Sequence, residues 1–214
     1  MRLDILLESD ELIAVDKPAG ALSVPSRLGR GDPRPCVLYA LSERFGRNFL
    51  PVHRLDEDVS GILVFAKTEE AHRRLNLAFE LRSTHKEYEA WTEARMTPPE
   101  GEVTFEDRLY RGKKRSFVAP HGKVAITFAR VAGRVPFAGR EYLRWTLHPQ
   151  TGRSHQLRVQ LALRGFPIVG DRLYDAKVDF MGGGIALRAV RLSVGVPIEA
   201  PDLAAWMASA RGGH

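Results

Sequence analysis

Apolar runs separated by short polar segments recur along the chain, and this pattern predicts more strands than helices. The continuous apolar run at residues 61–66 indicates a buried strand. A helix is expected directly after it, because Thr68 suits the N-cap position and two glutamates follow at the positive end of the helix dipole. The apolar stripe of this helix is Ala71, Leu75, Ala78 and Phe79.

The rest of the chain continues this mixture of elements. Further strands are expected at residues 11–16, 85–93, 103–107, 116–119, 124–131, 141–147 and 185–194. Further helices are expected at residues 35–45, 151–164 and 202–210. We therefore predict an α+β fold in which helices flank a mixed, mostly antiparallel central sheet. The length fits a single domain spanning residues 1–214.

Charge and composition narrow the classes of partner. The chain has 32 Lys and Arg against 26 acids and a pI near 9.7, which favours a polyanionic partner. The single cysteine, Cys36, excludes an intrachain disulfide or a cysteine-based metal motif, and its apolar neighbours predict burial. No apolar run is long enough for a membrane helix, and acids interrupt the N-terminal segment, so we expect a cytoplasmic protein.

Three stretches hold candidate chemistry, and the first is residues 53–61, HRLDEDVSG. It places Asp56 in a polar loop that opens into the predicted buried strand. Loops held by a rigid scaffold commonly carry catalytic residues. An ordinary acidic turn would fit the same residues.

The second stretch is residues 151–161, TGRSHQLRVQL. Its expected first helical turn carries Arg153, His155 and Gln156, which can hydrogen-bond a phosphate or a base. Arg158 follows on an apolar helix, where a buried guanidinium needs a carboxylate partner. The alternative is an arginine that extends its charged group to the surface.

The third stretch is residues 85–91, HKEYEAW, where strand alternation turns Lys86 and Tyr88 to the same side. An aromatic ring beside a base-reading cleft can stack on a nucleobase, although an ordinary sheet tyrosine fits as well. A basic run follows at residues 110–116, YRGKKRS. Its side chains are expected to contact phosphates, unless the run is a solvated hairpin. The basic side chains of this run are Arg111, Lys113, Lys114 and Arg115.

Taken together, these motifs resemble the RluA-type pseudouridine synthases. The family pattern H-R-L-D-x-x-T/S-S-G matches residues 53–61, K-x-Y matches Lys86 and Tyr88, and T-G-R-T/S-H-Q-I/L-R-V matches residues 151–159. Further matches lie at residues 16–20 (DKPAG), 122–127 and 167–171 (PIVGD). The matches follow the family order and cover nearly the whole chain.

The resemblance implies a pseudouridine synthase catalytic fold and a set of roles. Asp56 falls on the essential aspartate, Tyr88 on the base-stacking tyrosine, and Arg158 on the arginine that pairs with the catalytic carboxylate. Arg54 matches an arginine associated with filling the space left by a flipped nucleotide. The implied partner is structured RNA, either tRNA or large-subunit rRNA, and neither a cofactor nor a metal is expected. The chain resembles the compact branch that lacks an extra N-terminal RNA-binding domain, and we expect a monomer.

Three positions depart from the family pattern. Val59 stands where threonine is usual, Gln160 where histidine is frequent, and Arg188 where the pattern has the histidine of L-H-A. None replaces the aspartate, so the departures bear on the substrate more than on the reaction type.

Two other functions stay open from the sequence. One is a catalytically silent RNA-binding or folding-helper protein, against which the joint presence of Asp56, Tyr88 and Arg158 argues. The other is a glycoside hydrolase that uses Asp56 with Asp58. That class needs carboxyl groups roughly 5–9.5 Å apart, which two positions in a loop do not assure.

Overall fold

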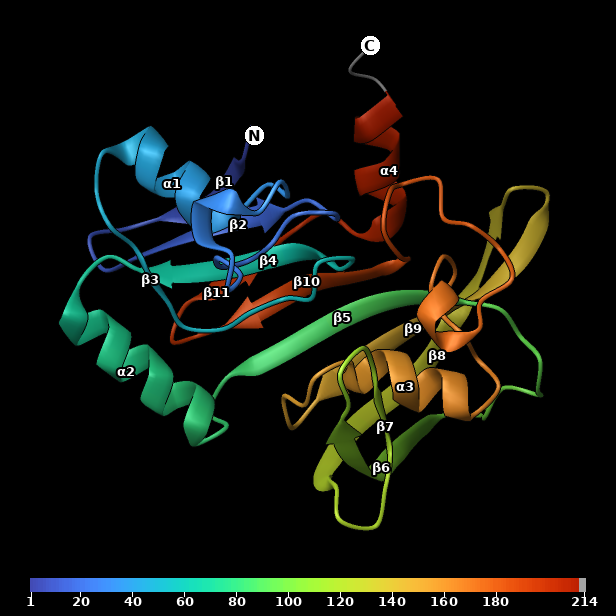
Figure 1. Ribbon diagram of the computed structural model, residues 1–214. Helices are drawn as coiled ribbons and strands as arrows, with labels where there is room; N and C mark the ends of the chain where they lie inside the picture. Colours follow the sequence, from blue (N-terminus) through green and yellow to red (C-terminus); the bar gives the residue numbers. More distant parts are fainter. Residues whose placement is uncertain (212–214) are drawn as a thin grey trace. The chain divides into compact units, whose positions relative to one another are not determined.

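The computed structural model describes residues 1–211, with the backbone alone for residues 210 and 211. The chain divides into two compact units (Figure 1). Unit 1 comprises Met1–His85 and Arg188–Pro201, and unit 2 comprises Lys86–Leu187 and the segment from Asp202 onward. Each unit is built around strands of its own.

The strands of unit 1 follow the order β1-β2-β4-β10, with β3 added to β4 and β11 to β10. They are β1 (Asp4–Glu8), β2 (Leu12–Lys17), β3 (Leu50–Pro51), β4 (Ser60–Ala66), β10 (Leu187–Ser193) and β11 (Pro197–Glu199). Every residue of β4 is buried, as its apolar run predicts. β10 runs parallel to β4, and the other pairings within this unit are antiparallel. At Gly61, a Cβ atom would lie 2.2 Å from the carbonyl oxygen of Ala189, so the close approach of β4 and β10 requires glycine.

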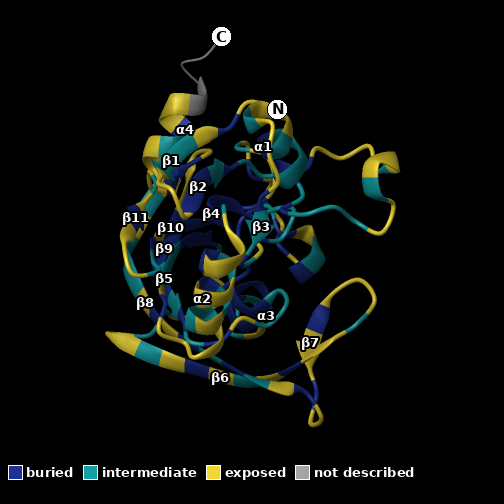
Figure 2. Cartoon of the chain, turned by 90° about the vertical axis from the view of Figure 1, so that its left-hand side faces the viewer, coloured by how far each residue is buried: buried dark blue, intermediate teal, exposed yellow. Residues whose placement is uncertain are grey.

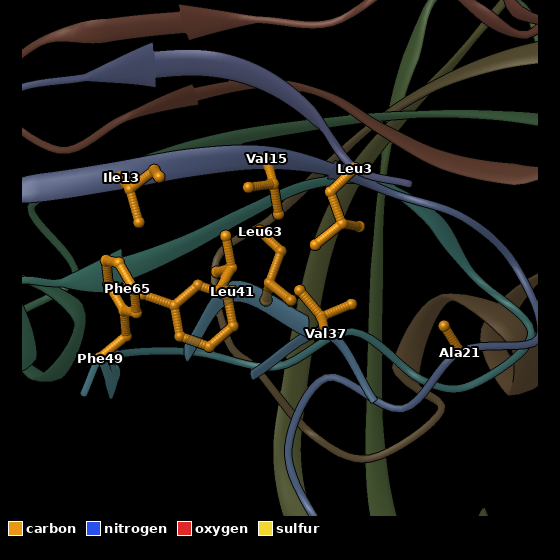
Figure 3. Close-up of a cluster of buried hydrophobic side chains, with 9 residues drawn as sticks. All are labelled: Leu3, Ile13, Val15, Ala21, Val37, Leu41, Phe49, Leu63 and Phe65. Carbon is orange, nitrogen blue, oxygen red and sulfur yellow. The ribbon is translucent and has the colours of Figure 1, made fainter. Parts of the chain in front are cut away.

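Two helices, α1 (Val37–Phe45) and α2 (Glu69–Glu80), and the short 3-10 helix η1 (Gly29–Gly31) complete unit 1. α1 ends at Gly46, whose φ of 62° is left-handed. α2 begins at Thr68, whose side chain accepts a hydrogen bond from the Ala71 amide at 3.1 Å. Side chains of α1 point into the core beside β2 and β4 (Figure 3). The nine buried members of this core are Leu3, Ile13, Val15, Ala21, Val37, Leu41, Phe49, Leu63 and Phe65.

Unit 2 is an antiparallel sheet in the order β5-β9-β8-β6-β7. Its strands are β5 (His85–Thr92), β6 (Glu102–Arg111), β7 (Ser116–Val118), β8 (Lys123–Phe137) and β9 (Arg140–Pro149). Its helices are α3 (Gln156–Leu163), η2 (Arg172–Tyr174) and α4 (Leu203–Arg211). Val159 of α3 and Tyr174 of η2 pack against Leu109 of β6 and Ala125 of β8, so one face of the β6–β8 pair is covered. Along most of β6, exposed residues alternate with residues that are half-buried or buried (Figure 2).

The predicted α+β fold with a mixed, mostly antiparallel sheet is confirmed, and one helix boundary is corrected. The helix expected from residue 151 begins at Gln156, because His155 has a left-handed φ of 54° that no helix accommodates. Thr151 and Arg153 instead bind the Gln156 side chain, which holds residues 151–155 as a loop. Strands β1, β3 and β11 were not predicted. Within residues 1–211, no helix is long and apolar enough to cross a membrane.

Candidate active site

The loop that carries Asp56 is tied to the end of β2 by a buried lysine. The Lys17 ammonium donates hydrogen bonds to the carbonyl oxygens of Pro18 at 3.0 Å, Glu57 at 3.0 Å and Val59 at 2.7 Å. Lys17 is completely buried. The carbonyls of Glu57 and Val59 lie one and three positions after Asp56. Lys17 therefore fixes the path of the backbone just after the candidate catalytic residue.

The same lysine brings positive charge to the loop. Burial lowers the pKa of Lys17 to about 8, although the negative charges of Asp56, Asp58 and Glu57 favour its ammonium form. Lys17 therefore still carries its charge at neutral pH, and it lies close enough to interact with the Asp56 carboxylate. It supplies both hydrogen bonds and a counter-charge to the loop.

A serine fixes the backbone on the other side of Asp56. The Ser23 hydroxyl donates to the Leu55 carbonyl at 2.8 Å and accepts from the Leu55 amide at 3.0 Å. The Gly20 amide donates to the Glu57 carbonyl at 2.9 Å, and the Val59 amide donates to the Asp56 carbonyl at 3.1 Å. The backbone of Asp56 is thus held from both neighbours and by its own carbonyl.

The residues that precede Asp56 have distinct placements. The Nε2 atom of His53 accepts a hydrogen bond from the Val64 amide of β4 at 3.0 Å, and the His53 ring stacks on Phe79 of α2 at 5.0 Å. Arg54 is exposed, whereas Leu55 next to it is buried. His53 therefore anchors the start of the loop, and Arg54 is presented to solvent.

In unit 2, Arg158 lies inside the protein and is paired with an aspartate. Its Nε atom donates to Asp171 Oδ2 at 2.7 Å and its Nη2 atom to Asp171 Oδ1 at 2.8 Å, a bidentate contact. The two side chains are 3% and 1% exposed. The expected carboxylate partner for a buried Arg158 is confirmed, and the surface alternative is wrong. Asp56 belongs to unit 1 and Arg158 to unit 2. The predicted pairing of Arg158 with Asp56 stays a prediction.

Tyr174 joins the loop before α3 to the basic hairpin. Its hydroxyl donates to the Ser116 carbonyl at 3.0 Å, accepts from the Ser116 amide at 2.9 Å, and lies 3.0 Å from His155 Nδ1. With both backbone bonds made, the hydroxyl has an acceptor site left for Nδ1–H of His155. The structure thereby brings His155 together with the segment that carries the basic residues.

The other RNA-binding candidates of unit 2 differ in exposure. Lys113, Lys114 and Arg115 are exposed in the turn between β6 and β7, which is closed by a bond from the Gly112 amide to the Arg115 carbonyl at 3.0 Å. Arg153 is half-buried and donates through Nε to the Val124 carbonyl at 2.9 Å.

Gln156 has a different environment, because it is only 4% exposed. Its amide nitrogen donates to the Ile126 carbonyl at 3.0 Å and to the Thr127 hydroxyl at 2.8 Å. These bonds give Gln156 a role in holding the loop before α3 against β8.

Lys86 and Tyr88 lie on β5, and both are half-buried. Tyr88 pairs in register with Leu147 of β9. Strand alternation places both residues on one face of β5, as predicted, and Glu89, which follows Tyr88 on the other face, is buried.

The three departures from the family pattern have physical accounts. Val59 is 3% exposed, so its apolar side chain fits its site. Gln160 of α3 is buried and bonds to the Thr127 hydroxyl at 2.7 Å and to the carbonyls of Phe105 and Ala125 at 3.2 and 3.1 Å. Arg188 forms an ion pair with Asp16 and donates to the Pro201 carbonyl at 2.7 Å.

Sequence reasoning missed the groups that hold the candidate residues in place. Lys17 and Asp171 lie within the matched segments DKPAG and PIVGD. The motifs therefore pointed to both residues, but they did not indicate that Lys17 binds the Asp56 loop or that Asp171 pairs with Arg158. Ser23 and Tyr174 lie outside the quoted patterns, and only the folded chain brings them to Leu55 and Ser116.

Comparison with known proteins decides the family. A sequence model described as RNA pseudouridylate synthase matches residues 11–163, which is more than half of the chain. The chain belongs to the RNA pseudouridine synthase family. Its reaction is accordingly the isomerisation of uridine in RNA. Within the family, the chain is an RluA-type synthase.

Individual relatives of this pseudouridine synthase span most of its length. The dual-specificity RNA pseudouridine synthase RluA of Haemophilus influenzae is 37% identical over 204 residues, which cover 92% of this chain and 88% of the relative. Ribosomal large subunit pseudouridine synthase D of Vibrio parahaemolyticus is 35% identical over 220 residues. This match covers 94% of this chain and 65% of the relative. Among solved structures, human RNA pseudouridylate synthase domain containing 1 is similar with a TM-score of 0.75 and 25% identity, covering 94% of this chain and 84% of that one.

Proposed function

We propose that this synthase converts specific uridines of tRNA or large-subunit rRNA to pseudouridine, with Asp56 as the catalytic carboxylate. The observation that carries the proposal is the construction of the Asp56 loop. Lys17, Ser23 and Gly20 fix the backbone around one carboxylate and place a cation near it. The names of relatives with dual-specificity and ribosomal large subunit activities support the choice of RNA.

The reaction breaks the bond between N1 of the uracil and C1′ of the ribose, turns the base, and rejoins it through C5. The C5 proton leaves and N1 takes up a proton, so the atoms balance and the product is an isomer of the substrate. Asp56 acts either as nucleophile at C1′ or as base at C2′, and a negatively charged carboxylate serves both roles.

The target nucleotide has to leave its stack, which costs on the order of a few kcal/mol. Tyr88 offsets this cost by stacking on the flipped base, a contact worth about 1–3 kcal/mol. Arg54, which is exposed, fills the space that the nucleotide vacates. Lys86 shares the face of Tyr88 and contacts the RNA backbone.

Arg158 is proposed to pair with Asp56 as well as with Asp171. The bidentate bond to Asp171 uses Nε and Nη2 and fixes the plane of the guanidinium. A guanidinium fixed in this way stays charged and orients a second carboxylate without rearranging. Asp171 then acts as a positioning residue for Arg158.

The remaining RNA contacts are assigned to exposed and half-exposed cations. Lys113, Lys114 and Arg115 contact phosphates, while Arg153 and His155 contact the RNA from the loop before α3. Gln156, also a candidate RNA contact, acts mainly by holding this loop. Residues 1–214 act as one catalytic domain in a cytoplasmic monomer, with neither a cofactor nor a metal.

A map of pseudouridine in cellular RNA with and without the protein tests the function. We expect one or a few sites in tRNA or large-subunit rRNA to lose the modification when the protein is absent. Re-expression of the wild-type chain should restore these sites, and Asp56→Asn at equal abundance should not. An unchanged map in both RNA classes would reject the proposed substrates.

A further inference from the structure

Three aromatic side chains form a row on the solvent side of β6, β7 and the turn that follows β7. Tyr110 and Phe117 are cross-strand partners whose ring centroids lie 5.6 Å apart at 55°, and His121 packs edge-on against Tyr110 at 4.7 Å. Tyr110 is 44% exposed and Phe117 43%. We call Tyr110, Phe117 and His121 the aromatic row.

The row is not part of the core. Phe105 and Leu109 of β6 are buried on the side that α3 and η2 cover, whereas Tyr110 follows the opposite alternation. The buried cluster on that side contains none of the three rings. Adjacent exposed rings mark a surface that meets a partner.

The charge of the molecule is concentrated around the same rings. Residues 108–123 contain six Lys and Arg and no acid, while the whole chain has 32 Lys and Arg against 26 acids. The rest of the chain therefore carries 26 of each, and this segment accounts for the entire net charge of +6. Such a segment attracts a polyanion.

We infer that the aromatic row and its basic neighbours bind unpaired nucleotides of the RNA, with bases stacked on Tyr110 and Phe117. Stacking rings combined with cations that follow a phosphate backbone are what single-stranded RNA binding requires. The inference rests on the proposed RNA substrate and adds a contact surface to it. A second copy of this chain does not fit, because it would bring two segments of the same positive charge together.

The surface has a defined end along β6. Glu106 is exposed on the face of Tyr110, four positions earlier, and places negative charge there. Arg108 lies between them and donates to the Gly122 carbonyl at 3.4 Å, which places its charge beside the turn that carries His121. Nucleotides are thus expected over Tyr110, Phe117 and the turn, but not over the first half of β6.

The test uses a uridine-free, unstructured RNA octanucleotide that contains 2-aminopurine, so that no isomerisation is involved. The wild-type protein should bind it and quench the fluorescence of the stacked base. The double variant Tyr110→Leu/Phe117→Leu keeps apolar side chains but loses both ring faces. Its affinity should fall by about 5- to 150-fold per stacked base, with the quench lost and the slope of affinity against salt unchanged.

Phe128→Leu is the matched control, because Phe128 is 37% exposed on β8 and pairs with Thr104, in the half of β6 outside the surface. It should bind as the wild type does. Equal affinity and quench in the double variant, or an equal loss in Phe128→Leu, would overturn the inference. So would a wild-type dimer that the double variant abolishes, since the row would then be a contact between copies.

Failure of the proposed function gives a different result. Asp56→Asn should bind the octanucleotide as tightly as the wild type. A protein that modifies no RNA but still loses quenching in the double variant would reject the function and keep the surface. An active enzyme whose octanucleotide binding is unaffected by the double variant would reject the surface alone.

Discussion

The loop that carries Asp56 and the hairpin that carries Lys113 and Lys114 are both polar connections between strands, yet they are held in different ways. The Asp56 loop is tied by the buried Lys17 and by both backbone groups of Leu55. The hairpin exposes its lysines; a turn bond between Gly112 and Arg115 closes it, and the Tyr174 hydroxyl holds it at Ser116. The first segment has a fixed backbone, and the second presents charge.

The difference follows from what each task demands. Chemistry at one carbon requires a carboxylate placed to within a fraction of an ångström, because small displacements of reacting groups cost large factors in rate. Attraction between cations and phosphates acts over several ångströms and tolerates movement. Changes in the Asp56 loop should therefore affect turnover, and changes in the hairpin should affect affinity and its salt dependence.

The largest effect is expected at Asp56. Asp56→Asn keeps the size of the side chain but removes the charge that either mechanism uses, so turnover should fall by at least about a thousandfold. RNA affinity should stay within about tenfold, since phosphate contacts supply most of it. Tritium release from the modified position and a filter-binding assay measure the two quantities. Turnover near the wild-type rate would remove Asp56 from the mechanism.

The next effect is on stability, at the buried pair in unit 2. Asp171→Asn leaves the Arg158 guanidinium buried without its counter-charge, which should lower the free energy of unfolding by about 3–5 kcal/mol. Asp175→Asn is the control, because Asp175 is 70% exposed in its pair with Arg95 and should change stability by less than about 1 kcal/mol. Chemical denaturation of both variants gives the comparison.

A double variant separates the structural from the catalytic role of this pair. Arg158→Met with Asp171→Leu replaces two buried charges by apolar groups and should recover much of the lost stability. It should remain inactive if Arg158 also orients Asp56. Full activity in a stable double variant would contradict the proposed pairing with Asp56.

Lys17→Met tests the anchor of the Asp56 loop. The change leaves three carbonyls without their donor, so we expect a loss of about 2 kcal/mol in stability at pH 7 and about a hundredfold in turnover. Lys177→Met serves as the control, because Lys177 is 66% exposed. Equal turnover in both variants would show that the loop holds its shape without Lys17.

The pH dependence of stability provides a second readout for Lys17. Its pKa is lowered from 10.5 to about 8 in the folded chain, so between these values the unfolded chain binds more protons. The free energy of unfolding should then rise with pH through this window, and the cost of the buried charge is present in full below pH 8. Relative to Lys17→Met, the wild type should gain up to about 3 kcal/mol between pH 8 and 10.5. A constant difference between the two proteins across this range would reject the assignment.

Much of the fold could be predicted because the local pattern and the tertiary structure agree. The buried strand β4 was visible as an apolar run, and α2 had its cap at Thr68 and its stripe in the sequence. The start of α3 was misplaced, because Gln156 binds Thr151 and Arg153 and so replaces a helical turn by a loop. Propensity at residues 151–155 could not reveal bonds that depend on the neighbouring strand β8.

The candidate site shows the same limit more clearly. Asp56, Tyr88 and Arg158 could be named from motifs, since each has its own local pattern. Lys17 lies 42 positions from the Val59 carbonyl that it binds, and Ser23 lies 32 positions from Leu55. Such partners are determined by strand pairing and burial, which no local pattern encodes.

The smallest effect is expected in the basic hairpin, where it should appear as a change in salt dependence. Lys113→Ala with Lys114→Ala removes two exposed charges and leaves the turn bond between Gly112 and Arg115 in place, so folding should be unchanged. If both lysines neutralise phosphates, the slope of log affinity against log salt should fall in magnitude by up to about 2, and turnover at saturating RNA should stay the same. The exposed Lys177, changed to alanine, should leave the slope as it is. A slope that is unchanged in the double variant would mean that the hairpin is solvated and does not meet RNA. A loss of turnover at saturation would mean that it acts on the reaction, and the contrast with the Asp56 loop would then fail.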